Sequence, residues 1–347
     1  MSPTPSTTVR TTVSREWRLV RRPTGTPTES DVELAETELG PPRAGEVLVR
    51  NTVMSVEPYM WGRMAGSADY AEPFAIGAPM SGRTVGVVEL SADPSLPPGT
   101  TVVHDAGWRE AALLPVDAVR AVPAGSVPPS AWLGALGIPG FTAYVGLLDV
   151  ARCRPGETVF VSAAAGAVGS AVAQLAKAMG CTVIGSAGSA AKVRFLLDEL
   201  GLDAAFDYHD GSVRDGLGGA LERAGQDGLD VYFDNVGGEH LEAAIRRMRD
   251  HGRITLCGAI STYGGGTPGP RNLLLAIWHR LRIEGFIATD HDDRRPSFER
   301  VMARWLADGR IRNVETVRTG GIGAAFTAFT GLLAGRDIGK TVVALDG

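Results

Sequence analysis

The apolar positions between residues 159 and 186 follow the spacing of one strand–helix–strand unit. Residues 159–162 form a short apolar run rich in β-formers, and residues 181–186 form a second. Between them, the small residues 163–169 predict a tight turn, and apolar positions at helical spacing in 170–179 predict a helix that ends at Gly180. The glycines of this unit lie at its first strand-to-helix turn.

The pattern on either side of this unit predicts two different domains. Before about residue 125, short apolar runs are separated by frequent glycine and proline, which is typical of a compact β-barrel-like domain. After residue 130, helix-like and strand-like segments alternate, which predicts a doubly wound parallel sheet and an α/β fold class. The segments that alternate after the unit are 190–200, 204–207, 218–224, 231–235, 241–249, 253–257, 272–281 and 298–308, with a last strand-like run at 341–345.

Length and charge limit the classes of protein to consider. The chain has 347 residues, 44% of them hydrophobic and 21% charged, which suits two globular domains. A formal net charge of -5 argues against a nucleic-acid partner. No apolar run approaches the about 20 residues that span a bilayer, so no membrane partner is expected. Residues 1–15 lack the apolar core of a signal peptide and predict a flexible polar tail.

The cysteines predict reduced thiols and no metal site. Cys153, Cys181 and Cys257 are far apart and show no Cys-x-x-Cys spacing, which is typical of a cytoplasmic protein without a disulfide framework. Three cysteines cannot make a four-cysteine zinc site, and no cysteine precedes residue 153. The six histidines are scattered, and a lone histidine such as His104 cannot hold a metal.

The glycine-rich turn has the context of a dinucleotide-binding fingerprint. A diphosphate needs free backbone N–H donors and the positive end of a helix dipole, and a Cβ at the closest positions would push it away. Gly166 and Gly169 fit this need, while Ala164 occupies the position of the usual first glycine. The alternative is an ordinary glycine turn in another α/β protein.

The residues after the second strand favour NADPH over NADH. Units that bind NAD place an acid there to accept a hydrogen bond from the ribose 2′-hydroxyl. Here residues 186–189 contain no acid, and Lys192 supplies a cation at the start of the following helix. A solvated surface lysine is the alternative for Lys192.

Seven stretches of the chain resemble the zinc-independent branch of the medium-chain dehydrogenase/reductase superfamily, and more narrowly its prostaglandin reductase (leukotriene B4 12-hydroxydehydrogenase) and alkenal double-bond reductase group. They are VEPYMWGRM (56–64), GIPGFTAYVGLL (137–148), ETVFVSAAAGAVGSAVAQLAKAMGC (157–181), GSAGSAAKV (185–193), YFDNVGGEHLEAAI (232–245), GRITLCGAISTY (252–263) and DIGKTVV (337–343).

The resemblance implies domains, an activity and a set of site residues. We expect a GroES-like catalytic domain over 16–136 that is completed by 312–347, a Rossmann domain over 137–311, and an active-site cleft at their junction. The implied reaction is NADPH-dependent reduction of a C=C bond conjugated to a ketone or aldehyde. The implied cofactor-binding residues are Gly166, Ala167, Val168, Gly169, Ser186, Gly188, Lys192, Tyr208, Asn235, Cys257, Ala259, Ile260, Ser261, Tyr263, Phe286 and Ile287.

Without a metal, hydrogen bonds must stabilise the negative charge that forms on the substrate carbonyl oxygen when hydride adds to the β-carbon. The resemblance assigns this donor to Tyr263, with Tyr59 as a second donor or a pocket wall. A tyrosine that only packs is the alternative at both positions, and the cofactor's ribose hydroxyl is another donor. Trp61 stands where the group usually has arginine, so a prostaglandin-like acid is a less favoured substrate than a small or aromatic enone. Asp337 stands where the group commonly has an asparagine that contacts the cofactor, and a carboxylate there would repel the diphosphate.

Two other functions fit the same residues. One is a quinone reductase of the same superfamily, and the other is a non-catalytic NADPH-binding protein. A homodimer formed through edge strands of the Rossmann sheets is expected by analogy with the family.

Overall fold

The structure is a computed structural model that describes residues 11–67, 71–123, 125, 127–262 and 269–345. By packing contacts the chain divides into two units. Unit 1 contains the chain up to Leu133, Val317–Ala334 and the residues from Val342 onwards. Unit 2 contains Gly134–Thr316 and Gly335–Thr341.

Unit 2 is built on a six-stranded parallel sheet. The strand order is β10-β9-β8-β11-β12-β13, so the chain winds outward from β8 in one direction and then returns to wind in the other. This confirms the predicted doubly wound parallel sheet. The strands are β8 (Thr158–Val161), β9 (Thr182–Ala187), β10 (Ala204–Asp207), β11 (Leu229–Asp234), β12 (Met248–Leu256) and β13 (Arg282–Gly285).

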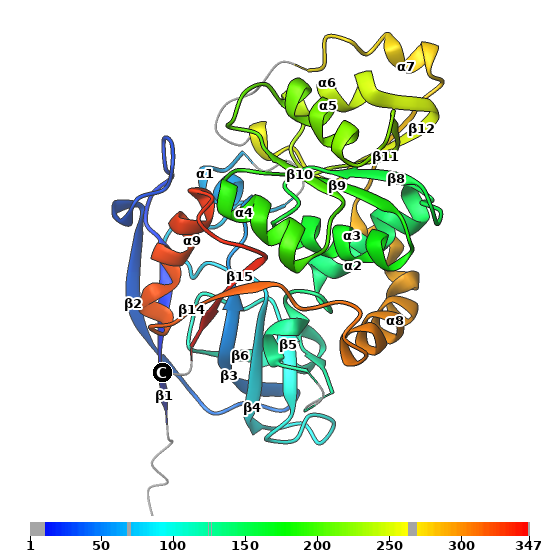
Figure 1. The fold of residues 1–347 in the computed structure, drawn as a ribbon. Helices are drawn as coiled ribbons and strands as arrows, with labels where there is room; N and C mark the ends of the chain where they lie inside the picture. Colours follow the sequence, from blue (N-terminus) through cyan, green and yellow to red (C-terminus); the bar gives the residue numbers. More distant parts are fainter. Residues whose placement is uncertain (1–10, 68–70, 124, 126, 263–268, 346–347) are drawn as a thin grey trace, which may run out of the picture. The chain divides into compact units, whose positions relative to one another are not determined.

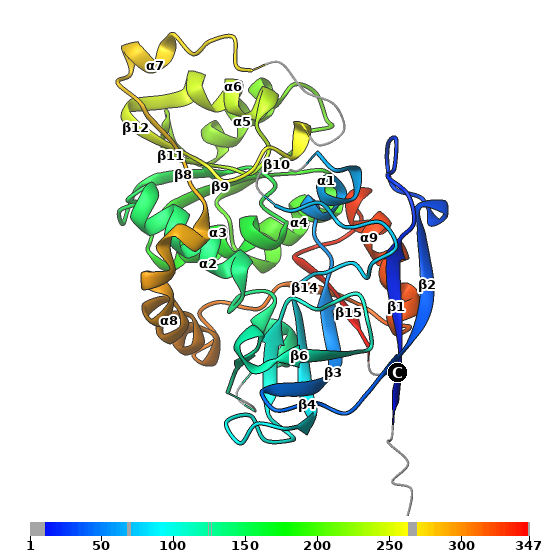
Figure 2. The ribbon, with the colours of Figure 1, turned by 180° about the vertical axis from the view of Figure 1, so that it is seen from behind.

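Helices cover both faces of this sheet. Helices α2 and α3 lie on one face and α5 and α6 on the other (Figures 1 and 2). All four residues of β8 are therefore buried, and the ring of Phe160 stacks on Tyr232 with 4.9 Å between the ring centroids. The helices are α2 (Ile138–Tyr144), α3 (Ala167–Ala178), α4 (Ala190–Arg194), α5 (Val213–Arg223), α6 (Gly238–Arg247), α7 (Leu275–Trp278) and α8 (Arg295–Ala307).

Unit 1 is a mainly antiparallel β-structure. Its larger sheet has the order β14-β15-β3-β4-β5-β7, with β6 paired to β3, and a separate two-stranded sheet joins β1 and β2. The strands are β1 (Thr12–Leu19), β2 (Val32–Leu39), β3 (Glu46–Ser55), β4 (Thr84–Ser91), β5 (Thr101–His104), β6 (Ala111–Pro115), β7 (Arg120–Ala121), β14 (Glu315–Arg318) and β15 (Lys340–Ala344), and the helices are α1 (Tyr59–Ala65) and α9 (Ala325–Leu333).

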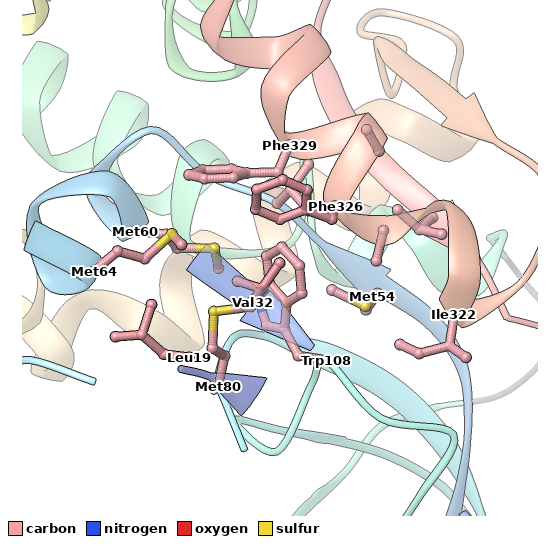
Figure 3. Packing of buried hydrophobic residues seen from close by; sticks show 14 of the residues in the cluster. Leu19, Val32, Met54, Met60, Met64, Met80, Trp108, Ile322, Phe326 and Phe329 are labelled. Carbon is pink, nitrogen blue, oxygen red and sulfur yellow. The ribbon is translucent and has the colours of Figure 1, made fainter. Parts of the chain in front are cut away.

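Aromatic and methionine side chains fill the core of unit 1 (Figure 3). Phe326 and Phe329 of α9 point into this core, and the rings of Trp108 and Phe329 are nearly perpendicular with 5.9 Å between their centroids. The indole of Trp17 donates a hydrogen bond of 2.7 Å to the carbonyl oxygen of Ile322. The C-terminal segment that carries α9 therefore completes the core of the N-terminal part of the chain.

The polar tail was expected to reach residue 15, but regular secondary structure begins before that residue. Strand β1 already begins at Thr12, and its polar Ser14 is buried because its hydroxyl exchanges hydrogen bonds of 3.1 and 3.0 Å with the backbone of Ala111. A buried polar side chain that is fully bonded looks like a surface residue in the sequence.

Two further segments differ from expectation. The helix expected over 272–281 is mostly turns, and α7 covers only Leu275–Trp278. Residues 312–316 and 335–341, expected in the catalytic domain, pack within unit 2. In particular, the N–H of Gly339 donates a 2.7 Å hydrogen bond to the carbonyl oxygen of Ala165 in the glycine-rich turn.

Candidate active site

The carboxyl ends of the parallel strands bring the cofactor residues predicted in unit 2 to one edge of the sheet. The strand order reverses between β8 and β11, and doubly wound sheets bind ligands at this reversal. Gly166, Ala167, Val168 and Gly169 follow β8, Ser186 and Gly188 lie at the end of β9, and Tyr208 follows β10. Asn235 follows β11, while Cys257, Ala259, Ile260 and Ser261 follow β12. Phe286 and Ile287 follow β13.

The N-terminus of α3 has no side-chain cap. Gly166 is its N-cap residue and makes no side-chain cap, so the N–H groups of Ala167, Val168 and Gly169 lack a capping side chain. A Cβ added at Gly169 would lie 2.3 Å from the carbonyl oxygen of Ala163, whereas one at Gly166 would meet protein atoms no closer than 3.2 Å. Packing of the turn therefore requires glycine at 169, while the contacts at 166 leave room for a small side chain.

The turn before α3 is held in place by two neighbouring segments. The N–H of Ala164 donates a 2.9 Å hydrogen bond to the carbonyl oxygen of Ser186, and Gly339 forms a bridge with Gly166. Gly339 has a φ of +70°, and a Cβ there would lie 2.1 Å from a backbone carbonyl oxygen of Val314. The position of the segment around Gly339 beside the turn was not expected from the sequence, because the two are more than 170 residues apart.

The end of β9 carries no acid, as predicted. The hydroxyl of Ser186 is fully buried and has no partner among the described residues. Ser189 instead caps α4, since its hydroxyl accepts a 3.3 Å hydrogen bond from the N–H of Lys192. A polar atom buried without a partner costs free energy, so Ser186 has an unused hydrogen-bonding capacity at this position.

Lys192 is half-buried and is bound by the segment Gly335–Thr341 of unit 2. Its ammonium group donates a 2.7 Å hydrogen bond to the carbonyl oxygen of Gly335. Burial lowers the pKa of Lys192, and the negative charge of Asp337 opposes this shift. The sequence contains only two other lysines, Lys177 and Lys340, so a lysine at this position is not part of a general surface pattern.

Tyr208 packs against backbone at the end of β9. A Cβ at Gly188 would lie 2.7 Å from the Tyr208 hydroxyl oxygen, so the glycine makes room for the phenol. The rings of Tyr208 and His240 in α6 are nearly perpendicular with 5.2 Å between their centroids, and burial raises the pKa of the phenol. His240 was missed in the sequence, where an isolated histidine in a helix gives no signal of a neighbouring site. It is buried, and its Nε2 has no partner among the described residues.

Asn235 is fixed by a buried polar network. Its backbone N–H and side-chain amide donate hydrogen bonds of 2.9 and 2.8 Å to the hydroxyl and carbonyl oxygens of Ser162. The carboxylate of Asp234 accepts hydrogen bonds from Tyr232 (2.6 Å) and from the N–H of Gly237 (2.8 Å). Burial nevertheless raises the pKa of Asp234. This network sets the shape of the chain where it leaves β11.

The segment after β12 folds back onto this corner. The N–H of Cys257 donates a 2.9 Å hydrogen bond to the carbonyl oxygen of Asp234, and the hydroxyl of Ser261 donates one of 2.5 Å to that of Val236. Burial raises the pKa of the Cys257 thiol to about 12. Ala259 packs beside Gly237, and the side chain of Ile260 is exposed.

Phe286 and Ile287 behave differently although they are adjacent. The ring of Phe286 packs against Phe233, and both rings fill the space left by Gly146. The side chain of Ile287 is 52% exposed. Phe286 therefore serves the packing of unit 2, while Ile287 offers a free apolar surface at the sheet edge.

The structure describes only one of the two predicted catalytic tyrosines. Tyr59 begins α1 in unit 1, packs against the core shown in Figure 3, and has its pKa raised by burial. Tyr263 lies outside the described residues.

Within the described part of the chain, no group of three or more His, Cys, Asp or Glu residues is arranged to hold a metal ion. No helix there is long and apolar enough to cross a bilayer.

Comparisons with known proteins agree with this arrangement. A family model described as the N-terminal domain of oxidoreductases matches residues 15–122, and one described as zinc-binding dehydrogenase matches 167–307. Prostaglandin reductase 1 of Rattus norvegicus is 43% identical over 95% of this chain and 98% of its own. The NADP(+)-dependent 2-alkenal reductase of Nicotiana tabacum is 41% identical over 92% and 94%. The crystal structure of CurA from Vibrio vulnificus in complex with NADPH, 37% identical, covers 96% of this chain and 99% of its own with a TM-score of 0.89.

The fold and these matches define the class, a two-domain oxidoreductase with a Rossmann domain. The chain belongs to the medium-chain dehydrogenase/reductase family, in the group of the prostaglandin reductases and alkenal double-bond reductases.

Proposed function

We propose that this protein uses NADPH to reduce the C=C bond of α,β-unsaturated ketones and aldehydes. The observation that carries the proposal is the match, over nearly the full chain, to reductases named for alkenals and prostaglandins. The comparison with a structure that holds NADPH supports the choice of cofactor.

The residues at the carboxyl edge of the sheet fit the cofactor. The N–H groups at the start of α3 and the positive end of its dipole suit the diphosphate, and no side chain at Gly166 obstructs it. Ser186 offers the adenosine side a buried hydroxyl that has no partner among the described residues. Asn235 and the backbone from Cys257 to Ser261 would line the ribose and nicotinamide, with Phe286 and Ile287 beside them.

Lys192 is proposed to select NADPH over NADH. Lys192 follows the end of β9, where NAD-binding sheets carry an acid, and its ammonium group donates to the carbonyl oxygen of Gly335. Tyr208 packs beside the same strand end on Gly188. A lysine without a carboxylate on β9 attracts a 2′-phosphate and gains nothing from a 2′-hydroxyl.

The proposed reaction needs no metal. NADPH, when bound, supplies the hydride. The protein must then stabilise the negative charge on the substrate carbonyl oxygen, and we assign this hydrogen bond to the phenol of Tyr263. Tyr59, whose pKa is raised by burial and which therefore keeps its proton at neutral pH, is the second candidate donor or a pocket wall. The absence of any cysteine before Cys153 supports this view, because a catalytic zinc of this superfamily would need a cysteine ligand in the stretch 54–60.

The test is a substrate panel followed by the loss of NADPH absorbance. The proposal expects conjugated enones and enals to oxidise NADPH, with the saturated carbonyl compound as product, and expects no reaction with isolated alkenes. A quinone reduced much faster than every enone would instead assign the quinone reductase function. Tight NADPH binding without turnover of any electrophile would assign a non-catalytic role. A saturated alcohol as product would refute reduction at the C=C bond.

We also propose a homodimer formed through unit 2. Strand β13 is the last strand of the sheet, and the segment just before it exposes four large apolar side chains. Leu273, Leu274, Ile277 and Trp278 are 54%, 60%, 69% and 61% exposed. Soluble monomers seldom expose so many neighbouring large apolar side chains, and an edge strand can pair with its own copy about a two-fold axis.

Light scattering with size-exclusion chromatography tests the dimer. We expect twice the chain mass for the wild type and one chain mass for Trp278→Lys combined with Ile277→Lys. Ile76→Lys, at a residue of unit 1 that is 57% exposed, is the matched control and should remain dimeric. A monomeric wild type would refute the dimer.

The reduced thiols of all three cysteines support a cytoplasmic location, which cell fractionation would test.

A further inference from the structure

Two buried thiols lie in contact at the end of the sheet opposite the cofactor edge. The sulfur atoms of Cys153 and Cys181 are 3.7 Å apart, and both residues are buried, at 8% and 3% exposure. Cys181 immediately precedes β9, and Cys153 lies in the loop that leads into β8. These two strands are neighbours, with Thr158 paired to Thr182, so the thiols lie at their amino ends.

The surroundings hold the two thiols together. The carbonyl oxygen of Arg154 lies 3.3 Å from the sulfur of Cys181 and 3.9 Å from that of Cys153. The backbone of each cysteine is fixed, because the N–H of Cys153 bonds to Leu147 at 3.0 Å and that of Cys181 to Ala176 at 3.1 Å. The sulfurs need to approach by only about 1.7 Å to reach the length of a disulfide bond.

We propose that Cys153 and Cys181 form an oxidation site that a peroxide converts into an intramolecular disulfide. One thiolate attacks the peroxide oxygen to give a sulfenic acid and release hydroxide. The other thiol then attacks this sulfur, forms the S–S bond and releases water. Two thiols and one hydrogen peroxide thus give one disulfide and two waters, with the two electrons passing from sulfur to the peroxide.

The contact leaves either sulfur able to act first, because either thiol can donate the hydrogen bond that joins them. Whichever sulfur is oxidised, its partner lies 3.7 Å away and is in position to resolve the sulfenic acid.

The disulfide would close a loop that contains β8, the glycine-rich turn and α3. Because the bond lies at the amino ends of β8 and β9, it would leave the groups at their carboxyl ends where they are. We expect oxidation to raise Tm, since the cross-link restricts the unfolded chain, and to change the Kd for NADPH by less than about twofold.

Peptide mapping of the native full-length protein tests the proposal. After hydrogen peroxide treatment, free thiols are alkylated in denaturant and the chain is digested with trypsin, which places Cys153 in peptide 153–177 and Cys181 in peptide 178–192. We expect these peptides to be joined with the loss of two hydrogens, and to separate again after reduction. Cys257→Ser is the matched control and should give the same cross-link, while Cys153→Ser and Cys181→Ser should not.

Any other result of this peptide mapping on the wild-type protein would contradict the proposed oxidation site. Sulfinic or sulfonic acid at either cysteine without a cross-link would overturn it, as would a cross-link to Cys257 or two thiols that remain fully alkylatable. A tenfold weaker binding of NADPH by the cross-linked protein would overturn the claim that the bond leaves the cofactor edge intact.

Discussion

Replacing Lys192 with methionine tests the proposed basis of cofactor selection. Methionine keeps an apolar stem of similar length but removes the charge that faces the proposed 2′-phosphate. The hydrogen bond to the carbonyl oxygen of Gly335 is lost with either cofactor, so its effect is common to NADPH and NADH. Only the interaction with the phosphate distinguishes the two.

The size of the effect follows from the position of the side chain. Two unit charges about 4 Å apart attract by ~1 kcal/mol in water and by ~4 kcal/mol near a protein surface. Lys192 is half-buried, and Asp337 already offsets part of its charge, so the lower half of this range applies. A loss of about 1–2.5 kcal/mol corresponds to about 5–70-fold in KM for NADPH.

Initial rates with an enone that the wild type reduces would measure KM for both cofactors. We expect the KM for NADH to change by less than about threefold. Lys177→Met is the matched control, because Lys177 lies in the last turn of α3, pairs with Asp203 at 2.8 Å, and is remote from the carboxyl edge of the sheet. Equal increases in KM for NADPH and NADH would refute the assignment of Lys192.

Four further predictions concern single side chains. Tyr263→Phe should lower turnover of an enone about 100-fold while KM for NADPH is unchanged, and near-normal turnover would remove this tyrosine from the mechanism. Asp337→Asn should lower KM for NADPH about threefold or more, measured against NADH, since it removes a negative charge near Lys192. Gly169→Ala should lower the free energy of unfolding by about 2 kcal/mol in urea, because its Cβ would lie 2.3 Å from a carbonyl oxygen, whereas Gly331→Ala, with nothing within 4 Å, should not. Burial lowers the pKa of His104 from 6.5 to about 3, so below pH 6.5 the unfolded chain binds a proton that the folded chain does not. The free energy of unfolding should therefore fall by about 1.4 kcal/mol for each pH unit by which the pH is lowered between about 6.5 and about 3. His104→Asn should remove this contribution to the pH dependence.

The periodicity of the chain was enough to predict unit 2. Its strands are buried on both faces, so each reads as a short apolar run, and its helices show their own period. Observed β10 matches the predicted segment 204–207, and β8 begins one residue before the predicted run. The glycine-rich turn was also predictable, because the need for glycine at 169 comes from the turn itself.

The sequence also indicated the family, which the comparisons confirm, and a reaction that agrees with the names of the relatives, whereas the roles of individual residues remain predictions. Two local expectations were wrong. The polar tail ends earlier than expected because buried Ser14 is satisfied by backbone hydrogen bonds, and the helix around α7 is short.

Only the tertiary structure could reveal what depends on contacts between distant segments. The chain itself determined where strands, helices and the phosphate-binding turn form, because these depend on side-chain period and backbone freedom within a few residues. The bridge from Gly339 to Gly166, the hydrogen bond from Lys192 to Gly335 and the contact of Cys153 with Cys181 were decided by folding. Nothing local marks such partners, since each pair is brought together by the packing of strands and helices that lie between them in the sequence.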